Sequence, residues 1–435
     1  MKLELGNFHV KDIVFGSKTF YENGVLTINK DEALSIVFED ENIIDADIHI
    51  AKSGDPIRIT PVKDAVEPRC KVSGGVMFPG VTNKLVPAGH GRTHILKGSC
   101  VLGVGKHWGG FQDGLIDMSG PGAKQTMFSQ LLNICLVADT NEEFEMHEQQ
   151  KRNKAIRWAA MRLAEYLGNC VKNMEPEELK VIEYHPLSQR SKEEIELPSV
   201  VYVLQLQSQM LESGYNALVY GWDSNRMLPT FLSPTELLDG AVVSGSFMPS
   251  SSKISTYQHA NNPTIMRLLE EHGKTINFLG VILSNLNVQL EEKERSALFV
   301  RQLATSLGAQ GAIVAEEGYG NPDSDFILVI NELEDAGIKV VGITNECTGR
   351  DGKSQPLVDL SEKANAIVST GNVSQYLELG PMEIVIGNLE ALARDGNSGG
   401  WSESVLPDGS IRMENNGMFC ADSSTGDYHK TVVEY

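Results

Sequence analysis

Short runs of alternating hydrophobic and polar residues dominate the first third of the chain and predict β-strands there. In residues 19–28 (TFYENGVLTI), Asn23 and Gly24 separate two such runs, a spacing typical of a tight β-hairpin. Residues 2–10 (KLELGNFHV), 33–40 (ALSIVFED) and 45–51 (DADIHIA) are also strand-like. The pattern predicts a β-rich N-terminal domain over residues 1–138.

The hydrophobic period then changes to that of a helix. Thr140 can cap a helix, and Glu143, three residues on, completes a capping box. Apolar residues recur at helical spacing from Ile156 to Leu167, and Gly168 is a typical stop. Residues 172–198 are polar, charged and bounded by prolines, which is typical of a linker. We therefore expect a long helix and a linker over residues 139–198.

From residue 199 onward, apolar strands alternate with amphipathic helices. Strands are predicted at residues 200–207, 276–283, 311–315 and 338–344. Helices are predicted to begin at Asn262-Pro263 and Asn321-Pro322, because the N–H that proline lacks has no partner in the first turn of a helix. Such alternation predicts a parallel sheet covered on both faces. The predicted fold class is α/β, with the β-rich domain followed by a doubly wound, mainly parallel domain over residues 199–395. Residues 396–435 form a tail rich in Gly, Ser and Asp, without a recognisable motif.

Ligands of doubly wound sheets bind beyond the carboxyl ends of the strands. In this chain the loops at that edge contain glycines and neutral polar side chains. These side chains include Gln207, Ser208, Tyr319 and Asn321. Each loop alone is compatible with ordinary turn chemistry, but together they predict a pocket for a small polar ligand.

The overall composition is that of an ordinary globular protein, with 41% hydrophobic and 22% charged residues. The net charge of −21 repels phosphate backbones and anionic membranes, so nucleic acid is a poor candidate partner. The N-terminus lacks the apolar stretch of a secretory signal, and no run reaches the length of a membrane span. We expect a cytoplasmic protein whose six cysteines, scattered without a CxxC pair, are reduced thiols.

Residues 89–98 (GHGRTHILKG) contain a further candidate site. Arg92 is a permanent cation that can bind a carboxylate through two hydrogen bonds, contact another subunit, or form a structural ion pair. His90 and His94 have the spacing of helical metal ligands, but Gly89 and Gly91 argue against a helix there. No metal site is therefore expected.

Residues 239–262 (DGAVVSGSFMPSSSKISTYQHANN) resemble the self-processing hairpin of the component B alpha/beta proproteins of the glycine, sarcosine and betaine reductases. The resemblance continues in residues 110–123, 204–209, 233–245, 316–325, 348–355 and 368–372. It implies a pyruvoyl group formed from an internal cysteine, and a partner subunit whose selenocysteine or cysteine cleaves the carbon–nitrogen bond. The family's two cysteine positions fall on Phe247 and Ser251, and this hairpin contains no cysteine.

Pyruvoyl formation requires a side-chain nucleophile on a strained turn. Phe247 cannot react, whereas Ser251, or Ser250 beside it, is a possible catalytic residue if the chain is processed; the other interpretation of the serine run is a flexible loop. We therefore expect no cofactor unless one of these serines is processed.

The resemblance implies a substrate-binding subunit of an oligomeric reductase complex that cleaves glycine or an N-methylated amine to an acetyl-level product. Arg92, Gln207, Ser208, Tyr319 and Asn321 are its predicted substrate-binding residues. The other hypothesis is an uncleaved, non-catalytic relative that binds or scaffolds another small ligand.

Overall fold

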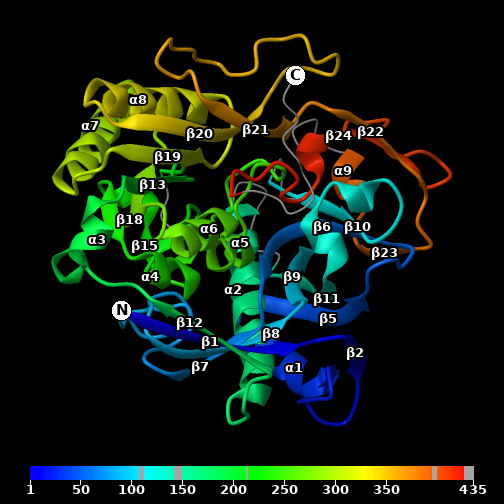
Figure 1. Ribbon diagram of the computed structural model, residues 1–435. Coiled ribbons are helices and arrows are strands. Elements are labelled where there is room, and N and C mark those ends of the chain that lie inside the picture. Colours follow the sequence, from blue (N-terminus) through cyan, green and yellow to red (C-terminus); the bar gives the residue numbers. More distant parts are fainter. Residues whose placement is uncertain (107–111, 142–148, 212–213, 394–398, 426–435) are drawn as a thin grey trace.

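The computed structural model describes residues 1–106, 112–141, 149–211, 214–393 and 399–425 (Figure 1). Two sheets build most of the N-terminal part. One has the order β12-β1-β8-β7, and the other has the order β10-β6-β9-β11-β5, with β23 pairing to β6. Their bounds are β1 Lys2–His9, β5 Ile43–Ala51, β6 Ile57–Val66, β7 Arg69–Ser73, β8 Gly91–Lys97, β9 Ser99–Gly105, β10 Gly114–Asp117, β11 Leu132–Thr140, β12 Glu178–Glu183 and β23 Ile384–Gly387.

The predicted hairpin at Asn23-Gly24 is confirmed. Strands β3 (Phe20–Glu22) and β4 (Val25–Ile28) pair antiparallel, and both turn residues have positive φ, 51° and 85°. β2 (Asp12–Phe15) completes this small sheet. The predicted strand at residues 33–40 is wrong, because residues 33–37 belong to helix α1 (Lys30–Val37). Asn29 caps it by accepting hydrogen bonds from the N–H groups of Asp31 and Glu32, a local signal that outweighs a short alternating pattern.

Helix α2 (Gln149–Gly168) packs its apolar face on the six-stranded sheet, where Ile156, Ala160 and Leu163 share a core with Ile134 and Leu136. Thr140 does not cap this helix, because it is the last residue of β11; Glu143 lies outside the described residues.

The predicted linker also differs from the structure. β12 lies inside it and pairs antiparallel with β1 along its whole length, and the short helix α3 (Lys192–Glu196) follows. Long-range strand pairing, rather than local sequence, orders this segment.

The doubly wound part is confirmed as α/β. Its sheet has the order β16-β18-β13-β19-β20-β21, in which only β16 is antiparallel. Helices α7 and α8 pack on one face, and α4 and α6 on the other. The bounds are β13 Ser199–Leu206, β16 Thr230–Leu232, β18 Asn277–Asn285, β19 Gly311–Glu316, β20 Lys339–Glu346, β21 Ile367–Asn372, α4 Pro234–Leu238, α6 Pro263–Glu271, α7 Leu290–Ser306 and α8 Asn321–Asp335.

Smaller elements join the two parts. β14 (Leu218–Val219), β15 (Trp222–Asp223) and β17 (Val242–Val243) form a short sheet ahead of helix α5 (Thr256–Ala260). In the tail, α9 (Glu390–Ala393) precedes β24 (Ile411–Glu414), which pairs with β22 (Tyr376–Leu379). Residues 415–425 are buried, so this part of the tail packs into the molecule.

Buried charges hold the two parts together. The Asp239 carboxylate, after α4, accepts hydrogen bonds from Lys71 Nζ, from Thr93 Oγ1 at 2.6 Å and from the N–H of Gly89 at 2.8 Å. Arg69 donates to the carbonyls of Leu238 and Ala260. Strands β7 and β8 are thereby fixed against the elements that flank the serine hairpin.

Candidate functional site

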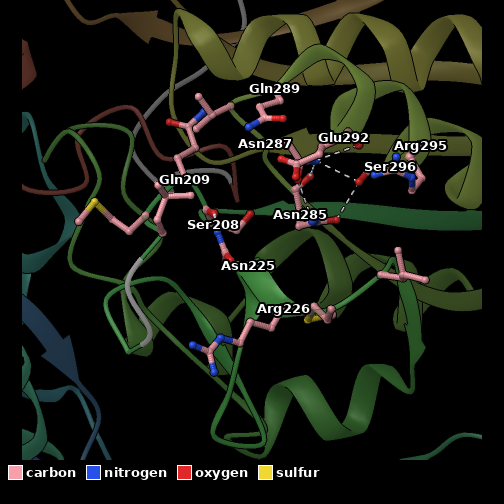
Figure 2. A pocket seen from close by; sticks show the side chains of 15 residues that line it. Ser208, Gln209, Asn225, Arg226, Asn285, Asn287, Gln289, Glu292, Arg295 and Ser296 are labelled. Carbon is pink, nitrogen blue, oxygen red and sulfur yellow. Dashed lines mark hydrogen bonds between the residues drawn. The ribbon is translucent and has the colours of Figure 1, made fainter.

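A groove of about 740 Å³ opens at the carboxyl ends of β13 and β18, where the sequence predicts a ligand pocket (Figure 2). Three chain segments form its walls: the loop after β13, the turn after β15, and the loop from β18 into α7. The lining residues are Ser208, Gln209, Met210, Leu211, Asn225, Arg226, Met227, Leu228, Asn285, Asn287, Val288, Gln289, Glu292, Arg295 and Ser296.

A network of amides and hydroxyls gives this groove a fixed floor. Asn285 Nδ2 donates to Asn287 Oδ1 at 3.0 Å, Asn287 Nδ2 donates to Ser296 Oγ at 3.0 Å, and Ser296 Oγ donates to Asn285 Oδ1 at 2.9 Å (Figure 2). Asp325 Oδ1 accepts from the Asn287 N–H at 3.1 Å and binds Lys293 Nζ through its other oxygen. Satisfied buried networks of this kind hold a wall rigid.

One of the predicted substrate-binding residues lines this groove, and a second is hydrogen-bonded to a residue that lines it. Ser208 lines it, and its Oγ donates to the Leu286 carbonyl at 2.6 Å. Asn321, the first residue of α8, donates from Nδ2 to the Asn287 carbonyl at 3.0 Å. Both side chains therefore tie neighbouring loops together at the groove.

The groove also has a charged rim that the sequence did not reveal. Arg226 and Arg295 are exposed, as is Glu292. Neither guanidinium has a carboxylate within 4 Å in the described part of the chain. Two unpaired arginines can bind a carboxylate through charge-assisted hydrogen bonds. One sequence signal for Arg295 was its position early in a helix that directly follows a strand of the sheet, because such a helix begins at the carboxyl edge.

The serine hairpin is not a flexible loop. Ser250, Ser251 and Ser252 are all 0% exposed. The tail covers them: the Cys420 N–H donates to the Ser250 carbonyl at 2.9 Å, and the Asp422 N–H donates to the Ser251 carbonyl at 2.8 Å. The prediction of a flexible loop is wrong because the sequence gives no sign that residues 415–425 fold back over the serines.

Hydrogen bonds to both parts of the molecule fix the ends of the hairpin. The Ser251 N–H donates to the Asn416 carbonyl at 3.1 Å, and Arg157 Nη1 of α2 donates to Ser246 Oγ at 2.6 Å. Asp64 of β6 accepts from Thr256 through both its N–H and its hydroxyl, at 3.0 and 2.6 Å. Within this fully described segment, no residue between 244 and 256 has a positive φ.

Two ionisable groups beside the hairpin have shifted pKa values. Burial lowers the pKa of Lys253, whose Nζ donates to the Lys63 carbonyl, to about 8. Burial raises the pKa of Glu317 to about 7, although its oxygens accept from the N–H groups of Ile254 at 2.9 Å and Gln207 at 2.8 Å. The electrostatics of the hairpin thus depend on groups that can change charge near neutral pH.

Several buried polar atoms near the hairpin lack partners. The hydroxyls of Ser250 and Ser251 and both side-chain amide atoms of Gln207 make no hydrogen bond with the described residues. Gln207 Oε1 lies so close to Gly245 that a Cβ there would approach it to 2.9 Å. Tyr319, which is half-buried, is hydrogen-bonded to Asn416, and desolvation raises its pKa. Such unsatisfied groups favour ordered water or a polar ligand in this place.

Arg92 is not part of either arrangement. It lies on β8 in the four-stranded sheet, and its Nε donates to Glu4 Oε2 at 2.8 Å. The Arg92 hydrogen bond lowers the pKa of Glu4. The sheet edge thus places Ser208 and Asn321 at the groove and Gln207 and Tyr319 beside the hairpin, while Arg92 is separate from both.

The described residues contain no group of three or more His, Cys, Asp and Glu side chains arranged to hold a metal ion. None of the described helices combines the length and the apolar character that crossing a bilayer requires. Gly110 and Phe111, the first two residues of the family-like segment 110–123, lie outside the described residues.

The sequence was compared with protein families and with known proteins. The family model for glycine/sarcosine/betaine reductase component B subunits matches residues 1–433. The chain is 64% identical to the betaine reductase complex component B subunit alpha of Peptoclostridium acidaminophilum over the full length of both chains. It is 44% identical to the glycine reductase complex component B subunits alpha and beta of that organism over 95% of each chain. Identity to its sarcosine reductase counterpart is 42% over both full chains.

No solved structure matches the chain. The family match covers nearly all of the sequence, including the serine hairpin and the loops at the carboxyl edge of the sheet. The chain therefore belongs to the glycine/sarcosine/betaine reductase component B subunit family.

Proposed function

We propose that this chain is the substrate-binding subunit of a betaine-type reductase complex and that it works without a pyruvoyl group. The observation that carries the proposal is the hairpin itself, in which Phe247 and Ser251 occupy the family's cysteine positions. The greater identity to the betaine reductase subunit, 64% against 42–44% for the glycine and sarcosine counterparts, points the same way.

The chemistry of the substrate explains why the carbonyl is dispensable. Glycine and sarcosine have a nitrogen lone pair and can condense with a keto group, whereas a quaternary ammonium has none. A subunit that binds betaine therefore gains nothing from a pyruvoyl group. The packing of the hairpin supports this interpretation, because the Ser250 carbonyl and the Ser251 N–H are both hydrogen-bonded to the tail and the turn shows no positive φ.

We place the substrate in the groove. Its carboxylate would bind Arg226 or Arg295, whose side chains lie apart on two walls of the groove, and Glu292 would face the ammonium group (Figure 2). Ser208 and Asn321 would shape this pocket by holding the loops around Asn287 and Leu286. Gln207 and Tyr319 remain proposed substrate residues on the hairpin side of the same sheet edge.

A partner subunit would carry out the bond cleavage. Reductive fission of the carbon–nitrogen bond requires two electrons and a nucleophile that takes up the carboxymethyl group. A selenol or thiol of a separate component B subunit would attack the methylene carbon and form a bond to it, while the electrons of the carbon–nitrogen bond leave with trimethylamine. A second thiol of the complex would then supply the two electrons that release the acetyl-level product, and it would be oxidised to a disulfide or selenide–sulfide bond. We propose that the N-terminal part docks this partner, with Arg92 at or near the contact.

Calorimetry with betaine, sarcosine and glycine tests the proposed function. We expect betaine to bind most tightly, and borohydride treatment to leave its affinity unchanged. Arg226→Ala with Arg295→Ala should weaken betaine binding at least tenfold, because the carboxylate loses its charged partners. Arg267→Ala on α6, an exposed arginine paired with Glu271, is the matched control.

Two outcomes would contradict the proposal. Tighter binding of glycine, lost on borohydride treatment, would restore a carbonyl-dependent mechanism. Failure of all three amines to bind, even with the partner subunit present, would favour the scaffold hypothesis.

A further inference from the structure

The ring faces of Tyr376 and Trp401 form a pair on the surface beyond β21. Tyr376 begins β22 and Trp401 belongs to the tail, and the two ring centroids lie 6.3 Å apart with an angle of 23° between the planes. β22 pairs with β24, so that Tyr376 lies opposite Glu414 (Figure 1). We call Tyr376, Trp401 and Glu414 the aromatic cage.

A cation of the chain itself occupies this cage. The guanidinium carbon of Arg350, in the loop after β20, lies 4.5 Å from the Trp401 ring centroid and 5.8 Å from that of Tyr376. Its Nε donates to Glu414 Oε1 at 2.7 Å. Both ring distances are within the roughly 6 Å at which cation–π attraction is effective. Two rings and a carboxylate thus converge on one positive group.

The Arg350 guanidinium is held in a place that solvent can reach. Its side chain is 51% exposed, and Tyr376 is 38% exposed. An exposed ion pair contributes little to stability, so the guanidinium can be displaced at small cost. Glu378, which accepts from the Tyr376 hydroxyl at 3.2 Å, adds a second carboxylate beside the cage. If Arg350 moves away, the remaining groups are aromatic ring faces and carboxylates. These are the groups that bind a quaternary ammonium, which has no N–H to donate.

We propose that the aromatic cage is a binding site for a quaternary ammonium ion, which exchanges with the guanidinium of Arg350. The site is separate from the groove, because none of its residues lines the groove. Betaine as its natural ligand rests on the proposed function; the cage itself does not.

The position of the cage connects it to the hairpin. Glu414 stands two residues before Asn416, whose carbonyl holds the Ser251 N–H, and the Asn415 N–H donates to the Gln375 carbonyl at 2.8 Å beside Tyr376. Arg350 lies in the loop whose Gly349 carbonyl accepts from Asn372 Nδ2 at 2.9 Å. Displacement of Arg350 would therefore remove one of the contacts that hold a loop at the carboxyl edge of the sheet.

Calorimetric titration with tetramethylammonium tests the cage without involving a carboxylate. Arg350→Ala should tighten binding about tenfold, because the internal competitor is gone, and Trp401→Leu should weaken it about tenfold. Trp401→Phe should give an intermediate affinity, which keeps the test valid if the leucine variant is poorly folded. Lys353→Ala, which removes an exposed positive charge from the loop of Arg350, is the control for general electrostatics; Trp222→Leu controls for loss of an exposed tryptophan.

The outcomes for the cage and for the proposed function are distinguishable. Equal tightening in Arg350→Ala and Lys353→Ala, or unchanged binding in both Trp401 variants, would overturn the cage. Betaine binding in the groove could survive either result. Conversely, tetramethylammonium could bind as proposed while betaine fails to bind the groove, which would overturn the function and leave the cage.

Discussion

Glu317 is the residue whose charge state should be visible in the stability of the protein. Its carboxylate is buried beside the hairpin, and its pKa is raised to about 7. In the unfolded chain the pKa is close to 4.5. Between these two values the folded state binds a proton that the unfolded state has released, so the stabilisation present below pH 4.5 is lost as the pH rises through 7.

Glu317→Gln should remove this pH dependence. Relative to the variant, the wild-type protein should lose about 3 kcal/mol of unfolding free energy between pH 4.5 and pH 8, since each pKa unit corresponds to about 1.4 kcal/mol. Urea unfolding midpoints at both pH values measure this difference. The exposed Glu362→Gln is the control, and equal pH profiles in wild type and Glu317→Gln would refute the assignment.

At this scale the sequence showed the residue types but not their surroundings. Ser250 and Ser251 were chosen from motif and position, yet their burial under the tail depends on contacts from residues more than 160 positions away. Arg226 and Arg295 were missed because only the position of Arg295, early in α7, has a sequence signal, and no local pattern relates it to Arg226 about 70 residues earlier. Glu317 and Lys253 lie in segments that the sequence singled out. Their pKa values are shifted mainly by burial, which the sequence does not show.

At the scale of elements, the end of α2 is fixed by a close approach. A Cβ on Gly168 would lie within 2.4 Å of the Arg69 backbone in β7. Alanine favours a helix by about 1 kcal/mol over glycine, but here the fixed backbone of β7 occupies the space. The sequence predicted Gly168 as a helix stop without showing why the site excludes a side chain.

Gly168→Ala should therefore destabilise the protein by about 1–3 kcal/mol despite the better helix propensity. Thermal unfolding provides the measurement. Gly380→Ala, where an added Cβ meets nothing within 4 Å, should be nearly neutral. An increase in melting temperature for Gly168→Ala would show that α2 and β7 can separate without loss.

The contact between β7, β8 and the α4 end depends on Asp239. Asp239→Asn should destabilise the protein by about 3–5 kcal/mol, because Lys71 is left buried without its counter-charge. Asp239→Leu combined with Lys71→Met should recover much of that loss, since it removes both charges. Denaturant unfolding of the single and double variants decides this, with exposed Asp359→Asn as control; a double variant no better than Asp239→Asn would contradict it.

Periodic elements were the most predictable. The strand–helix alternation, the Asn23-Gly24 turn and the helices that begin at Asn262-Pro263 and Asn321-Pro322 all follow from local sequence signals. The cap at Thr140 and the strand at residues 33–40 were assigned wrongly, because pairing partners or caps outside the pattern decide them. The segment assigned as a linker contains β12, whose pairing with β1 the local sequence does not indicate.

At the scale of the whole molecule, the serine hairpin is the centre on which three regions converge. β6 and α2 hold its ends, Glu317 of the doubly wound part binds its backbone, and the tail covers its serines. The family resemblance predicted that this segment matters, but not that a tail without a motif encloses it. An enclosed, hydrogen-bonded hairpin without cysteine is what we expect of a subunit that stays intact.

The intact mass of the purified protein tests that central claim most directly. We predict a single chain of 47.6 kDa, unchanged by incubation and unreactive toward hydrazine reagents that trap carbonyl groups. Two fragments separated between Pro249 and Lys253, the smaller one with a blocked terminus that such a reagent labels, would show that a serine had been converted to a pyruvoyl group and would contradict the account.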